Sequence, residues 1–293
     1  MFTGSMVALV TPMSADGTID WQALETLIEW QIQQGTDAIV SVGTTGESAT
    51  LSHDEHKAVI RFSVECVNKR VPVIAGAGAN ATKEAIDLTF SAYQGGCDAT
   101  LQVVPYYNKP PQSGLYRHFS QIAQSVPLPL LLYNVPGRTS CDLLPETVVE
   151  LAKIKNIVGI KEASTYERLE ILRQHFPRPS NFSILCGEDG ISARAVCSGL
   201  IDGVISVTAN IAPKQMHDLI DKGLKGDESA CLALNQSIAT LHEAMFTQTN
   251  PMPVKWALQR MGKIDNGIRL PLVELDEEHQ SIVEKALQQA KIL

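Results

Sequence analysis

The sequence has no closely spaced pair of cysteines and no long apolar segment. Its six cysteines are scattered without a C-x-x-C pair, which is typical of reduced thiols and gives no support to a disulfide framework or a zinc site. No apolar run is long enough to cross a bilayer, and the first residues carry neither the basic stretch nor the apolar segment of a signal peptide. We therefore expect a cytoplasmic protein without a membrane partner.

The sequence also has no excess of positively charged residues. The 24 Lys and Arg residues against 32 Asp and Glu residues give a formal net charge of −8. Surfaces for nucleic acids need clustered Lys and Arg, so we expect no nucleic-acid partner. With 44% hydrophobic and 19% charged residues and no low-complexity stretch, the composition is that of a globular protein. A small molecule is the expected substrate.

Short apolar runs alternate with longer amphipathic stretches along most of the chain. Their count and spacing predict an α/β fold with eight buried parallel strands, a (β/α)₈ TIM barrel. The expected strands are residues 6–10, 38–42, 73–75, 100–104, 128–132, 157–160, 182–185 and 204–207.

After about Gly226 the strand-like runs stop, and the remaining pattern predicts helices over 228–245, 254–261 and 276–292. We therefore expect a catalytic barrel over residues 1–225 and a small C-terminal helical domain over 226–293.

Unusual polar residues follow several of the expected strands. The carboxyl ends of barrel strands form one rim, where active sites of this fold lie. One site is therefore expected from the segments 43–47, 105–108, 133–138, 161–162 and 187–189.

Lys161 is the most informative of these residues. It closes the apolar run 156–160, and side chains alternate along a strand, so Gly159 and Lys161 face the same way, with the glycine leaving empty volume beneath the amine. Burial lowers the pKa of an amine, and a neutral lysine can condense with a carbonyl as a Schiff base. The alternative is a lysine whose ammonium reaches solvent or pairs with a carboxylate such as Glu162.

Four further side chains fit a carbonyl chemistry at this rim. Thr44 and Thr45 lie in a glycine-flanked loop suited to a carboxylate, although such a loop is also ordinary turn chemistry. Tyr133 can relay protons beside Lys161, or it can be a core tyrosine with a satisfied hydroxyl. Arg138 follows a Pro-Gly turn and can bind a carboxylate in two hydrogen bonds, or it can be a solvated loop arginine.

Three other motifs carry less weight. The segment 76–81 imitates a dinucleotide fingerprint, but Asp98 precedes its strand instead of ending it. The segment 46–50 lacks the closing glycine of a nucleophile elbow. His53 and His56 share a helix face, but no third metal ligand is evident nearby.

Together these segments resemble the dihydrodipicolinate synthase family of pyruvate-dependent class I aldolases, over effectively the whole chain. The most specific stretches are Val-Gly-Thr-Thr-Gly-Glu-Ser at 42–48, Pro-Tyr-Tyr-Asn at 105–108, Tyr-Asn-Val-Pro-Gly-Arg at 133–138 and Gly-Ile-Lys-Glu at 159–162. The resemblance implies a synthase that joins pyruvate to L-aspartate 4-semialdehyde, at the step committed to diaminopimelate and lysine. It also implies a homotetramer built as a dimer of dimers.

The resemblance assigns roles to individual residues. Lys161 would form the pyruvate imine, and Tyr133, Thr44 and Tyr107 would form a proton relay, with Tyr107 reaching in from a neighbouring subunit. The residues implied for substrate binding are Thr45 for the pyruvate carboxylate, Arg138 for the semialdehyde carboxylate, and the backbone of Gly187 and Ile205 near the amine.

A second, regulatory site is implied as well. In feedback-inhibited bacterial members of the family, L-lysine binds at a dimer interface, and seven residues here match that pattern: Ser48, Ala49, His53, His56, Asn80, Glu84 and Tyr106. Glu84 would pair with the α-amino group of lysine. Tyr106 is adjacent to Tyr107, so lysine binding is expected to disturb the relay.

Two segments depart from the family pattern. After residues 161–163 the family commonly has a glycine followed by Asn or Asp, whereas this chain has Ser164 and Thr165. Ser140 also stands where a glycine is usual. Thr165 adopts a positive φ less readily than glycine, so the shape of that loop is expected to differ.

Our leading interpretation is a lysine-pathway synthase that acts through a Schiff base. No metal or organic cofactor is expected, because the imine is itself the electron sink. One alternative is an aldolase or lyase of the N-acetylneuraminate lyase type, which uses pyruvate with a sugar-derived aldehyde. The other is a non-catalytic metabolite sensor that keeps the barrel and the lysine pocket.

Overall fold

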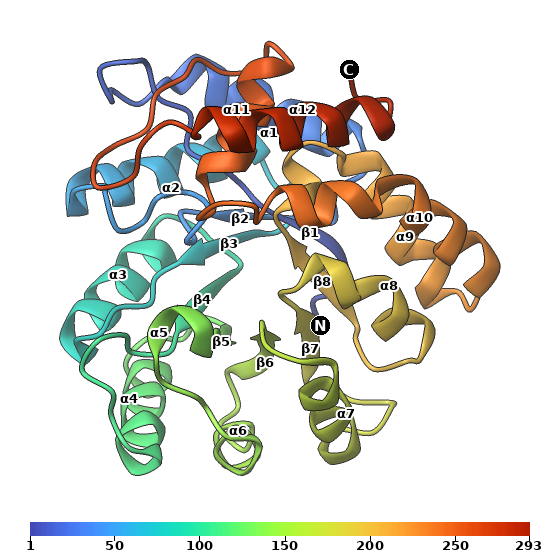
Figure 1. Ribbon diagram of the computed structural model, residues 1–293. Coiled ribbons are helices and arrows are strands. Elements are labelled where there is room, and N and C mark those ends of the chain that lie inside the picture. Colours follow the sequence, from blue (N-terminus) through green and yellow to red (C-terminus); the bar gives the residue numbers. More distant parts are fainter.

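The computed structural model describes residues 1–293, and its centre is a closed barrel of eight parallel strands surrounded by helices (Figure 1). Each strand pairs with the next one in sequence, and Met6 of the first strand lies opposite both Ala38 and Ile205, which closes the ring. The strands are β1 (Gly4–Ala8), β2 (Ala38–Ser41), β3 (Val73–Gly76), β4 (Ala99–Val103), β5 (Leu130–Asn134), β6 (Ile157–Glu162), β7 (Ser183–Cys186) and β8 (Gly203–Ser206). The predicted (β/α)₈ barrel is confirmed.

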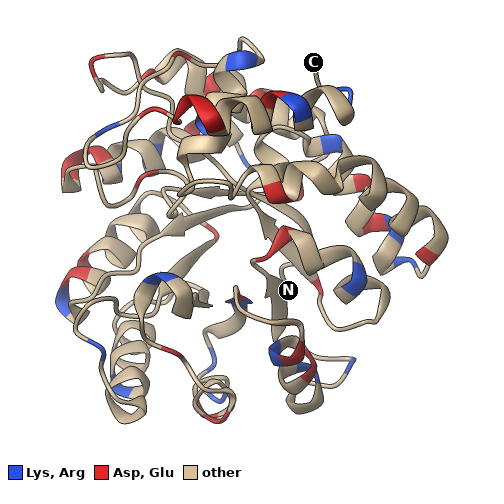
Figure 2. Ribbon diagram, in the orientation of Figure 1, with Lys and Arg blue, Asp and Glu red and all other residues tan.

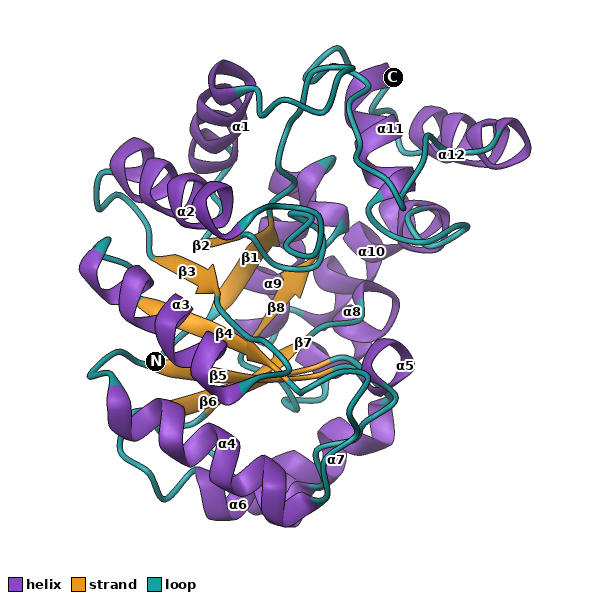
Figure 3. Cartoon of the chain, turned by 90° about the vertical axis from the view of Figure 1, so that its left-hand side faces the viewer, coloured by secondary structure: helices purple, strands orange, loops and turns teal.

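Helices cover the outside of the barrel, as the side view shows (Figure 3). They are α1 (Trp21–Gln33), α2 (His53–Val67), α3 (Thr82–Gln94), α4 (Gln112–Ser125), α5 (Pro136–Thr139), α6 (Pro145–Leu151), α7 (Tyr166–His175), α8 (Asp189–Cys197) and α9 (Pro213–Leu224), with the 3₁₀ turn η1 (Thr208–Asn210) after β8. A capping box begins α2, because the Ser52 hydroxyl accepts from Glu55 N–H and the Glu55 carboxylate accepts from Ser52 N–H.

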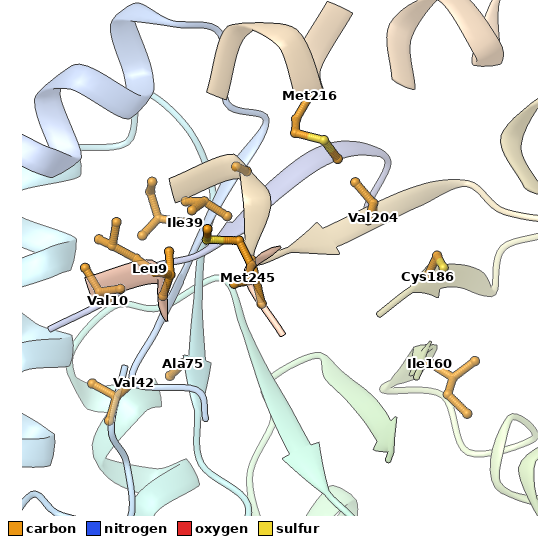
Figure 4. Close-up of a cluster of buried hydrophobic side chains, with 14 of the residues drawn as sticks. Leu9, Val10, Ile39, Val42, Ala75, Ile160, Cys186, Val204, Met216 and Met245 are labelled. Carbon is orange, nitrogen blue, oxygen red and sulfur yellow. The ribbon is translucent and has the colours of Figure 1, made fainter. Parts of the chain in front are cut away.

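The two faces of each strand contribute to two separate apolar clusters. Outward side chains such as Ile39 and Val204 pack beneath the helices (Figure 4). Inward side chains such as Val40 and Ile205 fill the barrel. Each fully buried aliphatic side chain of this kind contributes roughly 1.5–3 kcal/mol relative to an exposed one. Side-chain alternation therefore decides which polar residues of a strand can reach the barrel interior.

Gly159 faces the barrel interior, but the space beside it is filled. A Cβ atom at this position would lie 2.6 Å from the carbonyl oxygen of Ser183 and 2.8 Å from Cδ2 of Leu131. The prediction of an empty volume beneath the amine is therefore wrong. The glycine instead allows β6 to pack closely against its two neighbouring strands.

Three helices follow the barrel: α10 (Glu228–Ala244), α11 (Met252–Arg260) and α12 (Glu277–Gln289). They match the helices expected from the sequence. Cys231 and Leu241 of α10 and Leu258 of α11 belong to the same buried cluster as the outward side chains of the barrel. The division of the chain at residue 226 stays a prediction.

Acidic and basic residues are interspersed over the helices and loops (Figure 2). None of the helices has the length and apolarity needed to span a membrane.

Candidate active site

A cavity opens where the strands end, and it holds about 470 Å³ of empty space when its part open to solvent is included. Its wall comes from β1, β2, β4, β5 and β6, from the segments after β2, β5, β6, β7 and β8, and from the chain between α10 and α11. The lining residues are Ala8, Val40, Gly43, Thr44, Thr45, Leu101, Tyr133, Val135, Arg138, Lys161, Ala163, Gly187, Glu188, Val207, Phe246 and Asn250. Six residues predicted for the site therefore meet in one cavity: Lys161, Tyr133, Thr44, Thr45, Arg138 and Gly187.

Lys161 and Tyr133 lie side by side at the base of this cavity. They are direct partners in the register of β6 against β5. Their exposed fractions are 6% and 7%, and the Lys161 Nζ lies 4.4 Å from the centre of the Tyr133 ring. No carboxylate pairs with Lys161 and no hydrogen bond uses its amine. A carbonyl compound that enters the cavity to this depth therefore meets a lysine side chain that has no hydrogen-bond or acidic partner in the protein.

Glu162 follows Lys161 in β6 and faces the opposite way, toward the helices. Asn134 donates from Nδ2 to both carboxylate oxygens of Glu162, at 3.0 and 3.2 Å. Burial raises the pKa of Glu162 to about 7. The alternative in which Lys161 pairs with Glu162 is therefore wrong, because the two side chains occupy different compartments.

Gly187 leaves room for the lysine side chain. A Cβ atom on Gly187 would lie 2.8 Å from Cε of Lys161 and 2.6 Å from Cβ of Ala163. We expect Gly187→Ala to displace the amine and to reduce the rate of imine formation with pyruvate about 100-fold, since small misplacements of reacting groups have effects of that size. Borohydride trapping over time measures this rate.

Gly190→Ala is the matched control, because it lies three residues later with no atom within 4 Å of its Cβ position. An unchanged trapping rate in Gly187→Ala would contradict the steric role of this glycine.

Asn250 links the two groups predicted to bind carboxylates. Its Nδ2 donates to the Thr45 Oγ1 at 3.0 Å, and its carbonyl oxygen accepts from Nη2 of Arg138 at 3.1 Å. Its exposed fraction is 4%. Since Thr45 accepts a hydrogen bond from Asn250, its own hydroxyl proton is free to be donated to a ligand.

A buried ion pair supports the loop that carries Thr44 and Thr45. The carboxylate of Glu47, in that loop, contacts the ammonium of Lys255, in α11, and both side chains are almost fully buried. The backbone N–H of Arg269 also donates to Glu47, at 3.3 Å. Burial lowers the pKa of Lys255, and the charge of Glu47 opposes this effect. The C-terminal helices therefore hold one wall of the cavity.

Sequence reasoning did not identify Glu188, Val207, Phe246 and Asn250 as cavity residues. Glu188 was within a segment expected at the rim. Phe246 and Asn250 lie outside every strand-end segment, and no local pattern marks the loop between α10 and α11 as part of the site.

Two predicted site residues lie outside the cavity wall. Ile205 has no exposed surface and belongs to the barrel interior. Tyr107 is 88% exposed and has a positive φ of 73°. Within a single chain Tyr107 is thus not brought to Lys161. A second, smaller cavity next to the first is lined by Thr44, Tyr133 and Ser48 among others.

Several residues of the predicted lysine site lie close together on the surface between α2, α3 and the segment after β4. Nε2 of His53 lies 3.1 Å from the Glu84 carboxylate, and both side chains are accessible. Asn80 donates to the carbonyl oxygen of Tyr106 at 3.2 Å. Burial raises the pKa of Tyr106, and the charge of Glu84 adds to this effect.

The remaining residues of that set differ in exposure. Ala49 is exposed and Ser48 is half-buried, in the turn before α2. His56 is 6% exposed, with Nε2 at 2.7 Å from the carbonyl oxygen of Gly76. Burial lowers the pKa of His56. His56 is thus buried beneath this surface, whereas His53 is accessible to a ligand.

The two departures from the family pattern are accommodated differently. Thr165 has an extended backbone with a φ of −119° and caps α7, accepting from Arg168 N–H. This loop therefore needs no positive φ. Ser140 does adopt the left-handed conformation, with a φ of 52° at the end of α5. Glycine is favoured at such a position, so Ser140 retains some backbone strain.

Comparisons with known proteins agree with this geometry. The model of the dihydrodipicolinate synthetase family matches residues 1–290. A curated relative from Dichelobacter nodosus, named 4-hydroxy-tetrahydrodipicolinate synthase, is 61% identical over 283 residues, which are 96% of this chain and 95% of the relative.

Solved structures are similar over their whole length. The chloride-inhibited dihydrodipicolinate synthase from Acinetobacter baumannii, in complex with pyruvate, is 50% identical, with a TM-score of 0.97 and complete coverage of both chains. The enzyme from Cyanidioschyzon merolae with lysine bound is 36% identical, with a TM-score of 0.95, covering 100% of this chain and 99% of that one. The chain therefore belongs to the dihydrodipicolinate synthetase family and is an aldolase-type lyase.

Proposed function

We propose that the chain acts as a 4-hydroxy-tetrahydrodipicolinate synthase, condensing pyruvate with L-aspartate 4-semialdehyde in diaminopimelate and lysine biosynthesis. The observation that carries this proposal is the buried amine of Lys161, which has no acidic partner and lies against the Tyr133 ring inside the barrel. A pyruvate-bound relative that is 50% identical also supports the choice of the first substrate.

In the proposed reaction, the Lys161 Nζ attacks the keto carbon of pyruvate and water leaves, which forms an imine. Loss of a proton from the pyruvate methyl group gives an enamine, and this enamine attacks the aldehyde carbon. The ring then closes as the Lys161 amine is released. Neither a metal nor an organic cofactor enters these steps, because the imine takes up the electron pair.

Two carboxylates must be oriented for this reaction. We assign the pyruvate carboxylate to Thr45, whose hydroxyl proton is free because Asn250 donates to its oxygen. The semialdehyde carboxylate is assigned to Arg138, which Asn250 holds through its carbonyl oxygen. The backbone of Gly187 and Ile205 would line the site near the amine.

The proton relay proposed for these steps comprises Thr44, Tyr133 and Tyr107 of a neighbouring subunit. Tyr107 is almost fully exposed in the single chain, as a side chain donated to another subunit would be. The small cavity between Thr44 and Tyr133 has space next to both relay partners. A homotetramer and a cytoplasmic location stay predictions.

An assay with two aldehydes tests the proposal. Purified enzyme is given pyruvate with L-aspartate 4-semialdehyde, or with N-acetylmannosamine, the aldehyde partner of a sugar-acid lyase. The Arg138 guanidinium favours the first, since a polyol offers no carboxylate. Turnover of the sugar substrate alone would assign the chain to the N-acetylneuraminate lyase type. A sensor without activity would give no reduced pyruvate adduct on Lys161 after borohydride treatment.

We further propose that L-lysine inhibits the enzyme at the surface formed by Glu84, His53 and Asn80. The relative crystallised with lysine supports this assignment. Glu84 offers an accessible carboxylate to an ammonium group. Asn80 and Tyr106, which contact each other beside it, would bind the carboxylate of lysine.

We expect Glu84→Ala to raise the lysine concentration for half-inhibition at least about tenfold, because a charge-assisted hydrogen bond is lost. His56→Ala should act in the same direction, but Glu84 is the cleaner test because His56 is buried against Gly76. Initial rates with increasing lysine give the measurement, and pyruvate trapping should stay unchanged.

Glu228→Ala is the control, since Glu228 is likewise acidic in the first turn of a helix. Undiminished turnover of the unmodified enzyme at millimolar lysine would contradict this regulation.

A further inference from the structure

Glu188 is the only acidic side chain in the cavity wall, and imine formation and condensation do not use it. It follows Gly187 directly and immediately precedes α8. Its carboxylate is half-buried and makes no hydrogen bond or ion pair with any side chain. A carboxylate in this setting is available to a cationic group of a ligand.

We propose that the Glu188 carboxylate binds the α-ammonium group of the amino-acid aldehyde and takes one of its protons when the ring closes. The proposal rests on the proposed function, because only an aldehyde that carries an ammonium group needs such a partner.

The placement of Glu188 fits the shape of that substrate. The ammonium and carboxylate of an α-amino acid share one carbon atom, and the aldehyde group lies two carbons beyond it. If Arg138 holds the carboxylate while the aldehyde reaches the enamine on Lys161, the ammonium group lies between the two cations. Glu188 lines the same cavity as Lys161 and Arg138, and the positive charges of both residues act on its carboxylate.

The chemistry of ring closure requires a proton acceptor. An ammonium nitrogen has no free electron pair, so it cannot attack the protonated imine between Lys161 and the condensed product. One ammonium proton passes to Glu188, and the freed amine forms a C–N bond to the imine carbon. The ring nitrogen then forms a double bond to this carbon as the C–N bond to Lys161 breaks. The other two protons pass to the departing nitrogen, which leaves as an ammonium. Charge and atoms balance in this sequence.

The environment of Glu188 suits this transfer. Burial raises the pKa of Glu188, and the neighbouring Asp189 also raises it, while the charge of Lys161 opposes both effects. A carboxylate whose pKa lies closer to neutrality accepts a proton more readily than an exposed one.

Kinetics of Glu188→Gln test the proposal, because glutamine keeps the shape and removes the charge. We expect the KM for L-aspartate 4-semialdehyde to rise about 10- to 100-fold, with a lower kcat. Succinate semialdehyde, which lacks only the amino group, is used as a competitive inhibitor. Its Ki and the yield of trapped pyruvate should stay within about twofold of the unmodified enzyme. Glu188→Asp should recover part of the lost activity.

Other outcomes would overturn the inference. If Glu188 only balances the charges of Lys161 and Arg138, pyruvate trapping and the Ki of succinate semialdehyde will change together with the KM. An unchanged KM would also overturn it. Glu170→Gln, an exposed acid of α7, is the control. Failure of the proposed function is distinguishable, because the unmodified enzyme would then not turn over the aldehyde.

Discussion

Lys161→Ala is expected to lower the rate of condensation by roughly 10³-fold or more, as is typical when a covalent nucleophile is removed. The amine of Lys161 has no acidic partner in the barrel. Tyr133 cannot replace it, because a phenol does not form an imine. Intact-protein mass spectrometry after incubation with pyruvate and borohydride should show a single reduced adduct in the unmodified enzyme and none in the variant.

Lys263→Ala is a demanding control for this result. Lys263 is also a partly buried lysine, stacked on the Trp30 ring at 3.8 Å, and burial lowers its pKa. It lies outside the cavity, so trapping and turnover should be unchanged. An adduct that persists in Lys161→Ala and disappears in Lys263→Ala would refute the assignment of the nucleophile.

Lys255→Met is expected to lower the free energy of unfolding by about 3–5 kcal/mol, the usual result of breaking a buried ion pair. Glu47 would remain with a side chain that has no exposed surface and without its cationic partner. Urea unfolding followed by circular dichroism measures the loss. The KM for pyruvate should rise as well, because Glu47 supports the loop of Thr44 and Thr45.

The double variant Glu47→Gln with Lys255→Met should recover much of this stability, since no unpaired charge then stays buried. Lys225→Met is the matched surface control. Lys225 pairs with Asp221 at 2.8 Å but is 68% exposed, so its loss should cost no more than about 1 kcal/mol. Equal losses in the two single lysine variants would show that burial of the ion pair does not increase its effect on the free energy of unfolding.

The barrel was predictable because parallel strands buried on both faces give short apolar runs, and eight of them recur at regular spacing. The same regularity predicts that Lys161, Tyr133, Thr44 and Arg138 share one rim, since each of them ends or follows one of those runs. Alternation along a single strand also predicts that Lys161 enters the barrel, although the space beside Gly159 is filled by the neighbouring strands.

The rest depended on contacts between distant parts of the chain. Asn250 meets Thr45 across 205 positions in sequence, and Lys255 meets Glu47 across 208. Neither pair leaves a local pattern, because a single polar residue in a helix or loop usually faces solvent. Glu188 lay in a segment expected at the rim, but its lack of a partner could be recognised only from the assembled cavity.

The bridging position of Asn250 has a consequence for protein engineering. A shortened chain that ended after α10 would retain all eight strands and the reactive lysine, yet Thr45 and Arg138 would each lose a hydrogen-bond partner. Such a shortened chain should still form an imine with a keto acid, but it should bind the keto acid weakly. It would no longer orient the aldehyde. Attempts to transplant this chemistry onto another barrel must therefore carry over the segment after α10 together with the strands.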